Sequence, residues 1–179
     1  MKITETFLKG LFVIEPKVFG DSRGFFMETF NANEFEKHGL CTHWVQDNHS
    51  LSQKGVVRGL HFQNPNPQIK LVRVTRGAVL DVAVDIRPES PTFGKHFSIE
   101  LNEENKTWLY VPGGFAHGFS VLEDNTDFLY KCSEFYSPKD EGGILWNDPA
   151  LEIDWKVESA VISDKDKKHP TLAEYKKSL

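Results

Sequence analysis

The chain has 179 residues, of which 39% are hydrophobic, so it can enclose one sizeable core. We therefore expect a single domain over residues 1–179. The formal charge is −5, from 26 acidic and 21 basic residues, and like charges form no long block. This pattern argues against nucleic acid and anionic membranes as partners.

Cysteine content and hydropathy indicate a cytoplasmic protein. The two cysteines, Cys41 and Cys132, are too few for a disulfide scaffold, and we expect both to be reduced thiols packed as small hydrophobes. The N-terminal stretch MKITETFLKG lacks the apolar core of a secretory signal, and apolar residues nowhere form a run long enough to span a bilayer. We expect no membrane association.

Short apolar stretches between turn residues recur along the chain and predict β-strands. In chain order these stretches are GLFVIEP (10–16), GFFMETF (24–30), WVQDNHS (44–50), VVRGLHFQ (56–63), KLVRVTRG (70–77), AVLDVAVDI (78–86), KHFSIEL (95–101), TWLYVP (107–112), GFSVL (118–122) and TDFLYKCSEFY (126–136). Two segments predict helices. They are NANEFEKHG (31–39), with Asn31 as the cap and Glu34 three residues on, and HPTLAEYKKSL (169–179), with Pro170 near its start.

About ten strands with little helix predict an all-β fold, either a β-sandwich or a barrel, and a jelly roll is the version that closes most strand edges. Alternation is readable in VLDVAVDI, where the aliphatic residues at 80, 82, 84 and 86 share one face and Asp81 and Asp85 lie on the other. We expect the first face to be core and the second to be more polar.

The stretch VVRGLHFQ puts a histidine in an apolar run. Alternation places His61 on the face of Val57 and Gly59, with Arg58 on the opposite face. Glycine inside a strand often marks a bulge, so Gly59 could re-aim one of the two polar side chains. Taken alone, His61 fits a hydrogen-bonded structural histidine better than a catalytic one.

Two later strands are predicted to carry polar side chains inward. Lys70 shares a face with Val72 and Val74, and an inward ammonium needs an anion, either a carboxylate or a charge that develops on a substrate. A strand-end lysine that reaches solvent is the alternative. Tyr130 shares a face with Phe128, so we expect its phenol on the interior side.

The segment VPGGFAHGF contains a PxGxxH pattern formed by Pro112, Gly114 and His117, which is the second signature of cupin barrels. In metal-binding cupins this histidine joins an HxH pair and a glutamate around one ion. The chain contains no HxH, because His61 is followed by Phe62 and Gln63. We therefore expect no catalytic metal.

A series of motifs, in order and over almost the whole chain, resembles the dTDP-4-dehydrorhamnose 3,5-epimerase family. The motifs are EPKVFGDSRGFFMETF, QDNHS, VVRGLHFQ, KLVRV, VPGGFAHGF, FLYKCSEFYSP, EGGILWNDP and ISDKD. The resemblance implies a cupin-type jelly roll with a few short peripheral helices that forms a homodimer and needs no cofactor. It implies conversion of dTDP-4-dehydro-6-deoxy-D-glucose to dTDP-4-dehydro-L-rhamnose, a step in dTDP-L-rhamnose biosynthesis.

The same resemblance implies roles for individual residues. It makes His61 the base, Tyr130 the acid on the far face of the sugar, and Lys70 the cation that stabilises negative charge on O4. Asp166 of ISDKD would orient His61, and Asp81 is a second candidate for that support. The implied substrate-binding residues are Arg23, Glu28, Gln46, Asp47, Asn48, Arg58, Lys70, His117, Tyr136, Glu141 and Lys165, with Tyr136 stacking on thymine.

Two positions depart from the family pattern, and two other activities remain open. Ile69 stands where the family commonly has glycine, and Lys156 stands where it often has proline. A related enzyme could invert only C3 or only C5, and a non-catalytic cupin could bind a nucleotide sugar without reaction. The joint presence of a base, a cation and an acid argues against the non-catalytic cupin.

Overall fold

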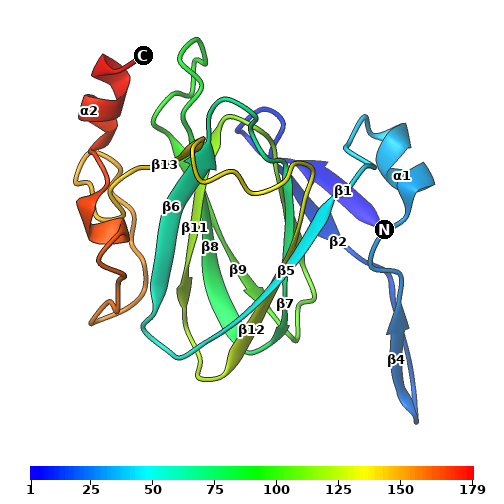
Figure 1. Ribbon diagram of the computed structural model, residues 1–179. Coiled ribbons are helices and arrows are strands. Elements are labelled where there is room, and N and C mark those ends of the chain that lie inside the picture. The colour runs from blue at the N-terminus through cyan, green and yellow to red at the C-terminus, as the bar shows by residue number, and fades with distance from the viewer.

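Two facing antiparallel β-sheets form the body of the molecule, which this computed structural model describes over residues 1–179 (Figure 1). The six-stranded sheet has the order β1 (Lys2–Glu5), β2 (Phe12–Glu15), β10 (Trp108–Val111), β7 (Lys70–Arg76), β12 (Thr126–Cys132) and β5 (Gln46–Ser52). The five-stranded sheet has the order β13 (Glu141–Gly143), β6 (Val57–Gln63), β11 (Phe115–Val121), β8 (Ala78–Asp85) and β9 (His96–Asn102). The fold is therefore a cupin-type jelly roll, as expected.

The peripheral elements are short. A hairpin of β3 (Val18–Asp21) and β4 (Gly24–Met27) forms its own two-stranded sheet and projects away from the body in Figure 1. The helices are α1 (Ala32–Lys37), α2 (Leu172–Lys177) and one 3₁₀ turn, η1 (Asp166–Lys168). None of these helices has the length and apolar character needed to cross a membrane.

Every strand and helix predicted from the sequence is present. Asn31 caps α1, since its side-chain oxygen accepts from the backbone N–H of Asn33 and Glu34 at 3.0 and 3.3 Å. The cap of α2 is Thr171, which forms a capping box with Glu174. The sequence patterns missed β1, β3 and β13, because these strands are only three or four residues long and largely exposed or glycine-rich.

The C-terminal segment covers the outer face of the five-stranded sheet, where it runs beside β6 in Figure 1. The aliphatic face of β8 packs under this segment, with Val82 and Val84 against Leu151 and Trp155. The opposite face of β8, which we expected to be more polar, points into the space between the sheets and is just as buried, since Asp81 is fully buried. The segment thereby brings residues 163–169 to the mouth of that space.

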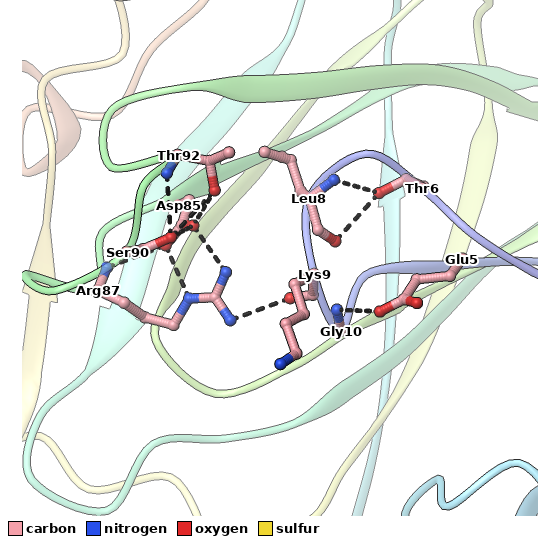
Figure 2. A network of polar contacts seen from close by, with 9 residues as sticks. All are labelled: Glu5, Thr6, Leu8, Lys9, Gly10, Asp85, Arg87, Ser90 and Thr92. Carbon is pink, nitrogen blue, oxygen red and sulfur yellow. Dashed lines mark hydrogen bonds and ion pairs between the residues drawn. The ribbon is translucent and has the colours of Figure 1, made fainter.

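A buried carboxylate ties the end of β8 to the N-terminal loop. Asp85 accepts hydrogen bonds from Arg87 Nε and Nη2 at 2.8 and 2.7 Å, and from the hydroxyls of Ser90 and Thr92 at 2.6 Å each (Figure 2). Arg87 Nη1 in turn donates to the backbone oxygen of Lys9 at 3.0 Å. Burial alone would raise the pKa of Asp85, but these donors outweigh it and hold the pKa at about 2.

We expect Asp85→Asn to lower the free energy of unfolding by about 2 kcal/mol near neutral pH, measured by urea denaturation. The folded-state pKa lies below the ordinary value of 3.8, so the ionised carboxylate stabilises the fold above that value. The stabilisation is lost as the pH falls toward 2, and the difference between variant and parent should vanish there. Asp154→Asn, at an exposed pair with Lys156, is the control and should leave the stability nearly unchanged. An equal loss in both variants would contradict this role of Asp85.

Candidate active site

A cavity of about 590 Å³ opens between the two sheets. Strands β5, β7 and β12 form one wall, β6 and β11 form the other, and the segment before η1 closes one side. The cavity brings together these residues singled out from the sequence: Asn48, Arg58, His61, Lys70, His117, Tyr130, Lys165 and Asp166.

An irregularity in β6 turns two polar side chains into this cavity. In the pairing with β11, His61 lies opposite His117 and Arg58 lies opposite Phe119, with a register shift between them. Simple alternation put Arg58 and His61 on opposite faces, and that expectation is wrong, because three positions on β6 match two on β11.

Gly59 makes this close approach possible. Its φ is +119°, and a Cβ at this position would lie 2.7 Å from Gly118 Cα and 2.8 Å from His117 O. No side chain fits there, so the bulge that the sequence suggested depends on glycine. Val57, which was expected to share a face with His61, instead packs in the outer cluster under the C-terminal segment.

His61 forms a hydrogen-bonded pair with Asp166. The distance from His61 Nε2 to Asp166 Oδ1 is 2.8 Å, and the backbone N–H of Gly59 donates to Asp166 Oδ2 at 3.2 Å. Burial would raise the pKa of Asp166, but the hydrogen bond and charge of His61 and the Gly59 N–H hold it at about 2. Because the carboxylate is ionised, His61 Nε2 carries the hydrogen, and in the neutral ring Nδ1 keeps a free lone pair.

Asp81 supports a different histidine from the one considered in the sequence. Its Oδ1 lies 2.9 Å from Nε2 of His117, and both side chains are buried. Asp81 therefore orients His117 in the wall of the cavity, and Asp166 alone pairs with His61.

Lys70 and Tyr130 lie on the opposite wall, in neighbouring strands. Lys70 Nζ is 6.0 Å from the centroid of the Tyr130 ring and makes no hydrogen bond within the chain, so the inward ammonium is available to an anionic ligand. Burial lowers the pKa of Lys70, and the nearby Asp81 and Glu141 carboxylates oppose that shift. Burial raises the pKa of Tyr130, which keeps the phenol protonated and able to donate.

Hydrogen bonds connect Tyr136, which is not part of the cavity lining, to the lining residues Asn48 and Lys165. Gln46 donates to Asn48 at 3.0 Å and accepts from the backbone N–H of Tyr136 at 3.0 Å. Glu141 accepts from the Tyr136 hydroxyl at 2.7 Å and from Lys165 Nζ at 2.5 Å. The backbone N–H and the hydroxyl of Tyr136 are thus both hydrogen-bonded, and its ring is exposed.

The remaining predicted binding residues do not reach the cavity of their own chain. The Arg23 side chain is 87% exposed in the β3–β4 hairpin and pairs with Asp21. Glu28 follows β4 and accepts from Asn31 at 3.0 Å. Asp47 points away from the cavity, as alternation along β5 requires with Asn48 facing inward, and it pairs with Lys131 at 2.9 Å.

Sequence reasoning missed one histidine beside the site. His169 lies beside the His61–Asp166 pair, with Nε2 3.5 Å from Asp166 Oδ1. His61, Asp166 and His169 are also the group whose ligand atoms are close enough to hold a metal ion. His61 lies 105 residues before Asp166, so no local pattern indicated this cluster.

The two departures from the family pattern leave the cavity intact. Ile69 packs in the cluster behind β7, and its backbone N–H donates to Ser133 Oγ at 2.9 Å, which anchors the residue before Lys70. Lys156 has a φ of 58°, which proline cannot adopt, and it lies outside the cavity lining.

The family model described as dTDP-4-dehydrorhamnose 3,5-epimerase matches residues 5–174. A curated relative of that name from Shigella flexneri is 54% identical over 168 residues, covering 93% of both chains. A crystal structure of the Elizabethkingia anophelis enzyme of that name has 48% identity, a TM-score of 0.93 and 97% coverage of both chains.

A third similar protein has been solved with a ligand. This is a dTDP-6-deoxy-D-glucose 3,5-epimerase from Legionella pneumophila, in complex with dTDP-4-keto-L-rhamnose. It is 49% identical, has a TM-score of 0.93 and covers 96% of this chain and 93% of its own.

Proposed function

The chain belongs to the dTDP-4-dehydrorhamnose 3,5-epimerase family, and on that premise we propose how its cavity carries out the reaction. The activity is isomerisation of dTDP-4-dehydro-6-deoxy-D-glucose to dTDP-4-dehydro-L-rhamnose by inversion at C3 and C5. Each inversion removes a proton from a carbon next to the C4 ketone and returns one to the opposite face. The site therefore needs a base, an acid and a group that stabilises an enolate.

His61 is the base in this proposal. Asp166 holds the hydrogen on Nε2, so the lone pair of Nδ1 is free to take a proton from carbon. Once His61 is protonated, the ionised Asp166 stabilises the imidazolium, as a carboxylate does for histidine bases generally.

Lys70 and Tyr130 complete the reaction from the other sheet. The Lys70 ammonium, which has no carboxylate hydrogen-bonded to it, stabilises the charge that develops on O4. The Tyr130 phenol returns a proton to the enolate carbon. His61 and Tyr130 stand on facing sheets, which supports proton removal from one face of the sugar and return from the other.

The nucleotide end of the substrate is assigned to the mouth of the cavity. Arg58 and Lys165 supply cationic donors for the diphosphate, and Tyr136 supplies the aromatic surface for thymine. Gln46 and Asn48 fix the backbone of Tyr136 and the adjoining wall through their hydrogen bonds.

The observation that carries these roles is the placement of the His61–Asp166 pair opposite Lys70 and Tyr130 in one cavity. Proton NMR of the 4-keto sugar nucleotide in deuterium oxide tests it. We expect loss of the C3 and C5 signals together with inverted product. Exchange at one carbon would indicate a single-centre epimerase, and binding without exchange would indicate a non-catalytic cupin.

We also propose that a second copy of this chain completes the site. The projecting hairpin exposes Phe19, Phe25 and Phe26, the last by 70%, and it carries Arg23 away from its own cavity. Exposed apolar side chains of this size on a protruding arm are suited to bury against a partner subunit. In a homodimer, Arg23 of one chain would bind the substrate in the cavity of the other.

Subunit complementation tests this arrangement. We expect Arg23→Ala and His61→Ala to be poorly active alone, and an equal co-expressed mixture to recover about a quarter of the parental activity, since each mixed dimer has one intact site. His61→Ala mixed with Tyr130→Phe is the control and should recover nothing, because both residues belong to the same cavity. Absence of recovery in the first mixture would contradict sharing of Arg23.

Three smaller proposals complete the assignment. Residues 1–179 act as one domain, because the cavity uses strands from both sheets and the C-terminal segment. The reaction needs no cofactor, since proton removal and return leave no change in oxidation state. A cytoplasmic location, with neither nucleic acid nor membrane as a partner, suits the free thiols of Cys41 and Cys132 and the net charge of −5.

A further inference from the structure

His169 stands beside the His61–Asp166 pair without a partner of its own. Its Nε2 is buried and makes no hydrogen bond, although it lies 3.5 Å from Asp166 Oδ1. The ring occupies the space over Gly143, where a Cβ would come within 2.4 Å of Nε2. The rings of His169 and His61 are 5.7 Å apart, so two imidazoles flank one carboxylate.

We propose that His61, Asp166 and His169 form a binding site for a divalent transition-metal ion of the zinc type, and that the ion inhibits the enzyme. Two imidazole nitrogens and one carboxylate oxygen are a ligand set that binds Zn²⁺ and leaves a fourth position open. Two of the three ligand residues, His61 and Asp166, line the cavity.

The geometry is close to what zinc requires. His61 Nε2 and His169 Nε2 lie 2.8 and 3.5 Å from Asp166 Oδ1, and the three ligand atoms are all within 4.8 Å of one another. Tetrahedral bonds of about 2.0–2.1 Å place ligand atoms about 3.3–3.4 Å apart. Side-chain shifts of about 1 Å or less would bring the three atoms to that spacing. The buried, unpartnered Nε2 of His169 would gain a bond in the process.

Metal binding would remove the catalytic lone pair. The neutral His61 ring carries its hydrogen on Nε2, toward Asp166, and its lone pair on Nδ1. A metal ion on Nε2 displaces that hydrogen as a proton, and the neutral ring takes a proton at Nδ1, so no net proton is lost. Nδ1 then has an N–H where the base needs a free pair, and His61 cannot accept a proton from the sugar.

Calorimetric titration of the untagged chain with Zn²⁺ tests the site without any substrate. We expect one ion per chain, with affinity weakened at least about tenfold in His169→Gln. His38→Gln makes the same change at an exposed histidine that lies outside the cavity, and it should leave the affinity unchanged. Equal Zn²⁺ affinity in His169→Gln and the parent, or no saturable binding, would overturn the site.

The inhibitory consequence rests on the proposed role of His61, so it has a separate readout. We expect Zn²⁺ to stop solvent exchange at C3 and C5 in the parent, and at least about tenfold more Zn²⁺ to be needed in His169→Gln. For each variant, the rate of solvent exchange without Zn²⁺ is the reference to which its rate with Zn²⁺ is compared. Saturation of the site without loss of exchange would overturn the inhibition. An inactive parent would refute the proposed function and leave the calorimetric result standing.

Discussion

Replacing His61 with alanine is expected to abolish exchange of the C3 and C5 hydrogens with solvent, a loss of about 10⁴-fold. His117 has a similar carboxylate pair with Asp81, but its side chain is only 7% exposed, against 31% for His61, so it is buried in the wall and less accessible to the sugar. Tyr130 stays protonated as burial raises its pKa. Without His61 the enolate cannot form, so both exchange and inversion stop.

The measurement is proton NMR in deuterium oxide, with dTDP affinity and thermal unfolding followed in parallel. His61→Ala leaves the Asp166 carboxylate with an empty space beside it, so His61→Asn, which keeps a side-chain donor there, controls for local collapse. Both variants should bind dTDP with parental affinity and lack exchange. Parental exchange rates in either folded variant would rule out His61 as the base.

Replacing Tyr130 with phenylalanine is expected to separate exchange from inversion. The change removes only the hydroxyl. The ring can keep its packing against Phe128, where the ring centroids are 5.9 Å apart. His61 and Lys70 still form the enolate, so exchange continues, but proton return from the far face loses its donor. We expect product formation to fall by about 10²- to 10³-fold while exchange falls much less.

The two rates are read from one NMR time course, as deuterium incorporation and as the appearance of inverted product. Tyr175→Phe, in α2 and outside the cavity, is the matched control and should leave both rates unchanged. An equal loss of exchange and inversion in Tyr130→Phe would mean that the phenol acts in enolate formation, contrary to its proposed role.

Strand periodicity predicted most of the fold and one wall of the site. Side chains alternate strictly along a regular strand, so Tyr130 on β12 was placed inward correctly. Of the two directions left open for Lys70 on β7, the structure shows the inward one. The same rule failed on β6, where Arg58 and His61 share the cavity because of the register shift at Gly59. Gly59 indicated that a bulge was possible there. The atoms that would clash with a side chain at this position belong to β11, so the sequence of β6 alone could not show that glycine is required.

Contacts between residues far apart in the sequence were either inferred from the family resemblance or missed. Nothing local in ISDKD places Asp166 beside His61, 105 residues earlier in the chain. The contact arises because the C-terminal segment buries Leu151 and Trp155 against the outer face of β8, which delivers η1 to the end of the cavity. His169 and its approach to Asp166 follow from the same packing.

The sequence by itself determined the all-β class, the positions of the long strands along the chain and the inward direction of Tyr130, because these depend on local periodicity. It left open whether Lys70 points inward or reaches solvent. Its motifs also identified His61, by resemblance to a family rather than by geometry. Only the tertiary structure decided which carboxylate serves which histidine: Asp166 for His61 and Asp81 for His117. It also showed that Arg23 and Asp47 lie outside the cavity of their own chain. Those outcomes depend on how separate strands and loops pack, and packing between distant segments leaves no periodic signal in the chain.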